Sequence, residues 1–179
     1  IGAFFPESEL TVVIGNPLVV SSVTYEHVLG HVFWGAIIGL GTLSIRYIIL
    51  GGSFAIFLDS DHLLQFLDIE LVSRMSHSIP FAVIVSIVFF VILRGKDIRM
   101  CVVAFAAVLS HLAFDVFLAD VAFGTNTKFP LFSPFTFDTI SFQGLDWLVI
   151  QSIGVALVAI VSYFYKRKEI KVKNNLTKT

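Results

Sequence analysis

The stretch IRMCVVAFAAVLSHLAFDVFLADVAF, residues 98–123, decides the fold class of this chain. Its apolar run is longer than the roughly 20 residues that a helix needs to cross the hydrocarbon core of a bilayer. The same run holds His111 and Asp115, and ionisable side chains are costly at bilayer depth. The stretch therefore predicts a transmembrane helix that carries a functional group.

The composition of the whole chain also indicates a membrane protein. Of its 179 residues, 56% are hydrophobic and only 14% are charged, whereas roughly a quarter of the residues of a soluble domain are charged. A water-soluble core cannot absorb that much apolar surface. The single cysteine, Cys101, lies inside an apolar run, which excludes a disulfide framework and a thiolate metal site.

Other apolar stretches predict further spans. Residues 145–165 and 78–93 are largely apolar. Residues 28–58 are interrupted by glycines and by Arg46, which favours two short spans that meet near Thr42, with one tilted span as the alternative. Residues 10–24 carry Asn16-Pro17 at their centre, which indicates a kinked or re-entrant segment, and whether it crosses the membrane stays open.

We therefore predict an all-α fold, a polytopic transmembrane helical bundle of about five spans, with four to six as the range. Residues 1–165 form a single transmembrane helical domain in this interpretation, and residues 166–179 form a basic cytoplasmic tail.

The distribution of basic residues predicts the orientation. Arg94, Lys96 and Arg99 lie between two spans, and residues 166–168 begin the tail. Two spans separate these basic clusters, so both fall on the same side, which the positive-inside rule makes cytoplasmic. Residues 59–77 and 124–144 then face outward. We expect a multi-pass protein of the cell membrane, inner or plasma, whose polar site faces outward.

Histidines and aspartates gather in four short motifs inside or beside the apolar stretches. The i, i+4 spacing places His27 and His31 on one helical face, and His111 and Asp115 on another. Imidazole and carboxylate without thiolate suit a divalent metal, zinc first, with manganese or iron as alternatives. The candidate metal ligands are His27, His31, Asp61, His77, His111 and Asp115.

The number of metals stays open. The set fits one metal with hydrogen-bonding partners around it, or two metals bridged by Asp61, and a two-metal site hydrolyses phosphoesters. Asp59 and His62 flank Asp61 and are the candidate catalytic residues that move a proton. The alternative is that the same side chains pair with one another in a polar packing network. Asp120, Asp138 and Asp146 are interpreted as solvated loop residues.

Four motifs and a loop, between about Tyr25 and Pro134, resemble those of a membrane-bound, metal-dependent hydrolase family of unknown function known as DUF457, or YdjM-like. They are EHVLGH (26–31), FLDSDH (57–62), RMSHS (74–78), SHLAFD (110–115), and Gly124 with PLFSP (130–134). The chain departs from the family pattern at Leu58, where a proline is usual, and at Ser73-Arg74, where His-Arg is usual. His-x3-Asp on an all-helical frame is more distantly similar to zinc-dependent phospholipase C and P1 nuclease.

Two functions follow from these interpretations. The first is a membrane-embedded, metal-dependent hydrolase that acts on a phosphoester-type lipid headgroup at the outer membrane face. The second is a non-catalytic membrane subunit of a larger complex, in which the same residues bind a structural metal or pack together; the departure at Ser73-Arg74 favours this one slightly. The expected partners are the lipid bilayer, a lipid substrate in the first case and other membrane subunits in the second, and no nucleic acid.

Overall fold

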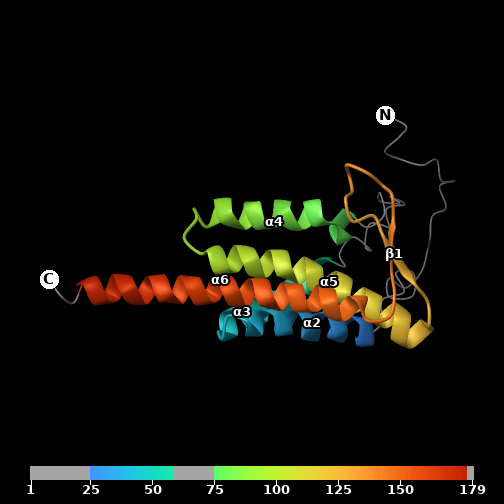
Figure 1. Ribbon diagram of the computed structural model, residues 1–179, viewed down its shortest axis with the longest axis horizontal. Coiled ribbons are helices and arrows are strands. Elements are labelled where there is room, and N and C mark those ends of the chain that lie inside the picture. Colours follow the sequence, from blue (N-terminus) through green and yellow to red (C-terminus); the bar gives the residue numbers. More distant parts are fainter. Residues whose placement is uncertain (1–24, 59–74, 177–179) are drawn as a thin grey trace.

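The computed structural model describes residues 25–58 and 75–176 of the chain. Most of these residues are helical (Figure 1). The helices are α2 (Tyr25–Leu40), α3 (Ile45–Leu58), the 3₁₀ helix η2 (Met75–His77), α4 (Ile79–Ile92), α5 (Ile98–Phe123) and α6 (Asp146–Leu176), and the strands are β1 (Thr127–Phe129) and β2 (Ile140–Phe142).

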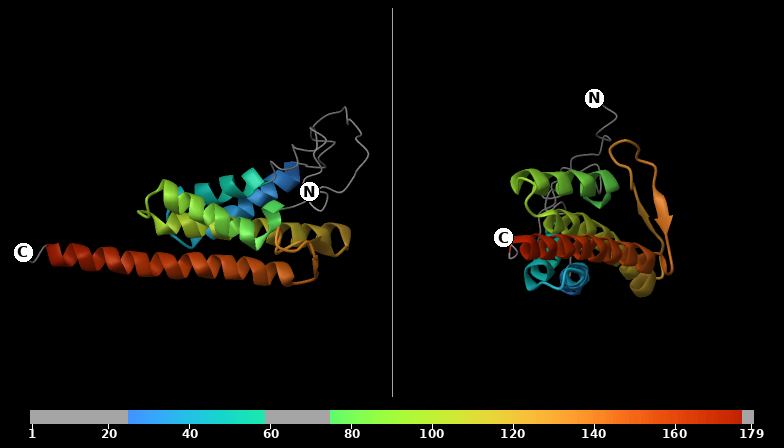
Figure 2. Two further views of the ribbon diagram at one scale, coloured as in Figure 1. Left: turned by 90° about the horizontal axis from the view of Figure 1, so that it is seen from above. Right: turned by 60° about the vertical axis from the view of Figure 1, so that its left-hand side comes forward.

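Helix α5 is the centre of the bundle. It contacts α2, α3, α4 and α6, and the views of Figure 2 show these helices arranged around it. Its most apolar window is 72% buried, whereas the corresponding window of α6 is 22% buried. Small side chains such as Ala104, Ala106 and Ala107 are fully buried on α5 and let its neighbours approach closely. The helix that carries His111 and Asp115 is therefore the most enclosed of the long helices.

Helices α2 and α3 form a tightly packed pair joined by a short turn. A side chain at Gly35 would collide with the backbone of Gly51, and one at Gly39 would collide with the backbone of Tyr47. Glycine at these positions therefore sets the distance between the two helices. This packing fixes where α2 presents its histidines relative to α3.

The predicted helices are confirmed at most positions. The stretch 98–123 is helix α5, residues 79–92 are α4, and residues 28–58 divide into two short helices with a turn at 41–44. Helix α6 begins near the expected position but continues through the basic segment to Leu176, beyond residue 165, and this end projects past the other helices (Figure 2). The expectation for residues 10–24 lies outside the described residues.

The all-α prediction missed a small antiparallel sheet. Strands β1 and β2 pair with Thr127 opposite Phe142 and Phe129 opposite Ile140. Phe129 is fully buried and packs with Leu112 and Val116 of α5. Three-residue strands are too short to produce an apolar run, so a search for long spans cannot find them.

The end of the bundle opposite the sheet carries the basic turns. The hydroxyl of Tyr47 lies 2.8 and 2.7 Å from the two carboxylate oxygens of Asp97. Arg46 lies 3.7 Å from the same carboxylate, and the guanidinium of Arg99 lies 4.3 Å from the ring centre of Tyr165. These contacts tie the α2–α3 turn, the start of α5 and the basic part of α6 together at one end.

Within residues 25–58 and 75–176, two helices are long and apolar enough to cross a membrane, namely the segments Ile98–Val121 and Asp146–Asn175 within α5 and α6. Helices α3 and α4 are apolar but shorter. This result rests on the length and composition of each helix.

Candidate metal centre

Histidines from three separate elements meet around one aspartate. Helix α2 supplies His27 and His31, η2 supplies His77, and α5 supplies His111 and Asp115. His31, His77 and His111 are each at most 2% exposed. Two groups of candidate ligand atoms result, and within each group all atoms lie within 4.8 Å of one another.

The first group consists of His27, His31 and Asp115. The Nε2 atoms of the two histidines are 3.0 Å apart, as their i, i+4 positions on α2 permit. His31 Nε2 also lies 3.3 Å from Oδ1 of Asp115. This group joins α2 to α5.

The second group consists of His77, His111 and Asp115. The Nε2 atoms of the two histidines are 2.9 Å apart, and His77 Nε2 lies 3.1 Å from Oδ2 of Asp115. His111 Nε2 lies 3.7 Å from the same oxygen. Asp115 therefore contributes one carboxylate oxygen to each group. The ring of His31 from the first group stacks on the ring of His111 from the second, with their centres 3.9 Å apart.

These separations fit metal ligation. Two ligand atoms bound to one ion at about 2.1 Å lie roughly 3.0–3.4 Å apart for octahedral or tetrahedral angles. The contacts between these atoms in both groups, from 2.9 to 3.7 Å, bracket that range. The donor set of imidazole nitrogens and one carboxylate suits Zn²⁺, Mn²⁺ or Fe²⁺.

Hydrogen bonds orient two of the rings. His111 Nδ1 donates to the carbonyl of Ala55 on α3 at 2.9 Å, and Ser76 Oγ lies 2.8 Å from His77 Nδ1. A proton held on Nδ1 of His111 leaves the lone pair on Nε2, which faces Asp115 and His77. Partners of this kind fix the tautomer of metal-binding histidines in proteins.

The local sequence explains how His77 reaches the centre. Ser78 caps α4 by accepting a hydrogen bond from the backbone N–H of Phe81, and Pro80 occupies the first turn. The backbone N–H of Ile79 donates to the carbonyl of Leu131 at 2.9 Å, which ties the start of α4 to the loop after β1. Phe129 then stacks on His77 at 5.5 Å with the ring planes nearly parallel.

A glycine makes room for the apolar wall on the α2 side. A side chain at Gly30 would overlap the ring of Phe114. That ring lies edge-on to His31 at 4.7 Å and to His27 at 6.0 Å. Apolar rings therefore flank both groups, and a hydrophobic shell of this kind limits water access and lowers the local dielectric constant.

Five of the predicted metal ligands lie in the described part of the chain. The structure brings together His27, His31, His77, His111 and Asp115. Asp59, Asp61 and His62 lie outside the described residues. Of the three aspartates predicted to lie in solvated loops, only Asp138 does, because Asp120 lies in α5 and Asp146 begins α6. All three accept hydrogen bonds nearby: Asp120 from Gly144, Asp138 from Thr136 and Asp146 from Gln143.

Three contributors escaped the sequence analysis. Ser76, the carbonyl of Ala55 and the ring of Phe129 all contact the cluster histidines. The Ser-His-Ser motif is the one signal that pointed to Ser76. The role of the Ala55 carbonyl could not be predicted, because every residue has a backbone carbonyl and the residue type does not distinguish it.

Comparison with known proteins gives the family. The family model described as YdjM inner membrane protein matches residues 23–175, which is most of the chain. The chain therefore belongs to that family and is a membrane protein. No curated protein and no solved structure gives a significant match.

Proposed function

We propose that this member of the YdjM inner membrane protein family is a membrane-embedded, metal-dependent hydrolase of a phosphoester-type lipid headgroup. The observation that carries the proposal is the pair of ligand groups that share the two oxygens of Asp115. Two-metal sites of phosphatases and nucleases place their ions about 3.5–4 Å apart, which a bridging carboxylate permits.

The residues divide into two ligand sets in this proposal. His27, His31 and Oδ1 of Asp115 hold one divalent ion, and His77, His111 and Oδ2 hold the other. When bound, such ions polarise a phosphoryl oxygen and make a coordinated water more acidic. The Ala55 carbonyl and Ser76 orient His111 and His77 of the second set, and the rings of Phe114 and Phe129 flank the first and the second set respectively.

Proton transfer in this proposal falls to Asp59 or His62, which flank Asp61 in the sequence. Asp59→Asn keeps the shape of the side chain and removes its basicity. The variant should bind metal like the wild type while turnover falls about 10²–10⁴-fold, as for a lost general base.

The proposed topology is a bundle of about five spans with the metal centre near the outer face. Helix α5 starts with Ile98 at its basic end, and Asp115 follows 17 residues later. Asp115 therefore lies about 26 Å along the helix from that end. Helices α3 and α4, with 14 residues each, are about 21 Å long. Local thinning of the bilayer accommodates helices of that length.

The clustering of basic residues supports the orientation. Arg46, Arg99 and the basic segment of α6 lie at the end of the bundle opposite the ligand groups. The positive-inside rule then places the metal centre on the outer side, where lipid headgroups reside.

Two measurements test the function. Purified wild-type protein is analysed for metal by elemental analysis and assayed for phosphate or headgroup release against a panel of glycerophospholipids. We expect bound divalent metal and hydrolysis that His111→Ala abolishes and Asp138→Ala retains, because Asp138 is an exposed loop residue bonded to Thr136. Full metal occupancy without release of any headgroup would contradict the hydrolase and favour a structural metal in a membrane subunit.

A further inference from the structure

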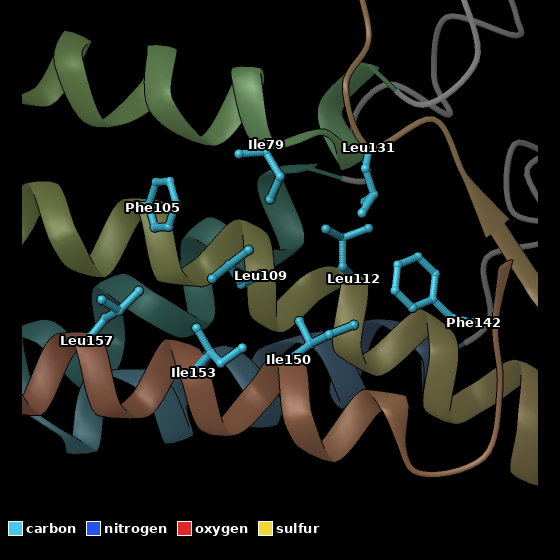
Figure 3. Close-up of a pocket in the computed structure, with 9 residues that line it drawn as sticks. All are labelled: Ile79, Phe105, Leu109, Leu112, Leu131, Phe142, Ile150, Ile153 and Leu157. Atoms are coloured by element: carbon cyan, nitrogen blue, oxygen red, sulfur yellow. The ribbon is translucent and has the colours of Figure 1, made fainter. Parts of the chain in front are cut away.

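An apolar cavity of about 320 Å³ lies beside the metal centre, between α5, α6 and the start of α4. Figure 3 shows its lining side chains, which converge from these helices and from the sheet region. Its volume falls within the range of about 300–1,000 Å³ that is usual for small-molecule sites.

The cavity is elongated along the helix axes. Phe105, Leu109 and Leu112 line it from α5 at i, i+4 and i+7, so they form one stripe that is about 10 Å long. The facing stripe on α6 runs in the opposite direction and consists of Ile150, Ile153 and Leu157. In Figure 3 the two stripes lie opposite each other along the length of the cavity. A space of this shape, parallel to transmembrane helices, matches the path of an acyl chain.

The chemistry of the walls excludes an aqueous occupant. Every lining side chain is a leucine, an isoleucine or a phenylalanine, and a buried water needs about two to four polar partners. The α6 wall is also open to the side, since Ile153 is 50% and Leu157 is 38% exposed. In a bilayer that side faces the hydrocarbon chains, so the cavity can fill from the lipid phase.

One end of the cavity lies close to the metal centre. Leu112 of its lining directly follows His111 on α5, and Ile79 lies two residues after His77. Leu131, whose carbonyl accepts from Ile79, closes the same end. At this end Leu112 and Leu131 pack with Phe129, whose ring stacks on His77, so this end is the one nearer to the histidines.

We propose that this cavity binds one acyl chain of the lipid whose headgroup reaches the metal centre. The assignment of the headgroup end rests on the proposed function, whereas the acyl-chain site rests on the cavity itself. The substrate class is thus a phospholipid held by one chain inside the protein.

Photochemical labelling tests the proposal. The probe is phosphatidic acid with a diazirine in one acyl chain, mixed into phosphatidylcholine vesicles that contain the full chain, and labelled residues are mapped by mass spectrometry. We expect label on Leu109, Ile153 and Leu157 at about ten times the level on Leu148, an exposed residue on the opposite face of α6. Equal labelling of both faces would mean ordinary contact with surrounding lipid and would overturn the proposal.

Substitutions sharpen the test. Ile153→Trp fills the cavity and should lower the label on Leu109 about tenfold, whereas the control Leu148→Trp adds the same ring outside it and should leave that label unchanged. If Ile153→Trp fails to fold, the pattern of label in the wild type decides the question. Undiminished label on Leu109 in a folded Ile153→Trp protein would refute the site.

The design separates this proposal from the proposed function. Label in the cavity of both wild type and His111→Ala, with no hydrolysis by the wild type, would leave the acyl-chain site standing and remove the hydrolase. Hydrolysis by the wild type with label spread evenly around α6 would support the hydrolase and remove the acyl-chain site.

Discussion

Replacement of Asp115 by alanine is the sharpest test of the metal centre. Its two carboxylate oxygens lie 3.3 Å from His31 and 3.1 Å from His77, so Asp115→Ala removes a ligand from both groups. His27→Ala removes a ligand from the first group alone, and His77→Ala from the second alone. The geometry therefore predicts unequal effects for substitutions within one cluster.

The expected sizes follow from metal linkage. An ion at about 100 times its dissociation constant stabilises the folded state by about 2.7 kcal/mol per site, so two sites give roughly 5 kcal/mol. His27→Ala and His77→Ala should each retain about half of this gain and about one ion per chain, whereas Asp115→Ala should retain almost none. For each variant, the gain in stability with metal is measured relative to the stability of the same variant without metal.

The assay is elemental analysis together with thermal unfolding of detergent-solubilised protein, with and without added Zn²⁺. Asp138→Ala is the matched control, because it removes a carboxylate from an exposed loop. If Asp115→Ala kept one ion and the same zinc-dependent shift as His27→Ala, the carboxylate would not be shared. If all of these variants kept the metal content of the wild type, the cluster would be a polar packing network.

Three further predictions concern the surroundings of the centre. Ser76→Ala removes a hydroxyl that contacts a ligand ring, so metal affinity measured by titration should fall about 10–100-fold, and unchanged affinity would exclude an orienting role. Gly35→Val collides with the backbone of Gly51 and should destabilise the protein by about 1–3 kcal/mol in thermal unfolding, with loss of metal; an unchanged melting midpoint would contradict the close packing. Phe132→Cys on a Cys101→Ala background should react with an impermeant thiol reagent in intact cells, and reaction only after lysis would reverse the proposed orientation.

The sequence predicts the helices well because each signal is local. The apolar run of residues 98–123 matches α5 at both ends. The break near Thr42 is visible because glycines and Arg46 interrupt an apolar stretch, and the structure places a turn there. The same local logic stops at β1 and β2, whose pairing joins Phe129 to Ile140 and Thr127 to Phe142 through three-residue strands.

The site was predictable as a set of residues but not as an arrangement. The i, i+4 spacing puts His27 with His31 and His111 with Asp115 on common helical faces. It does not tell which faces meet, because that depends on the α2–α3 packing and on the anchoring of Ile79 to Leu131. In the two-metal alternative Asp61 is the expected bridging carboxylate, and it lies outside the described residues; within them, Asp115 contacts both groups.

The charge of the centre connects the proposed metals to the proposed substrate. Asp115 is the one carboxylate that the described residues place in the two groups, and neutral histidines add no charge. Two divalent ions would leave roughly three positive charges there, or about one if Asp59 and Asp61 also face the centre. An excess of positive charge among apolar side chains raises the free energy of the folded protein until an anion neutralises it. A lipid phosphate would supply that anion, and the proposed acyl-chain site between α5 and α6 would hold its chain. The two features therefore favour the same class of molecule by independent physical arguments, one electrostatic and one based on shape.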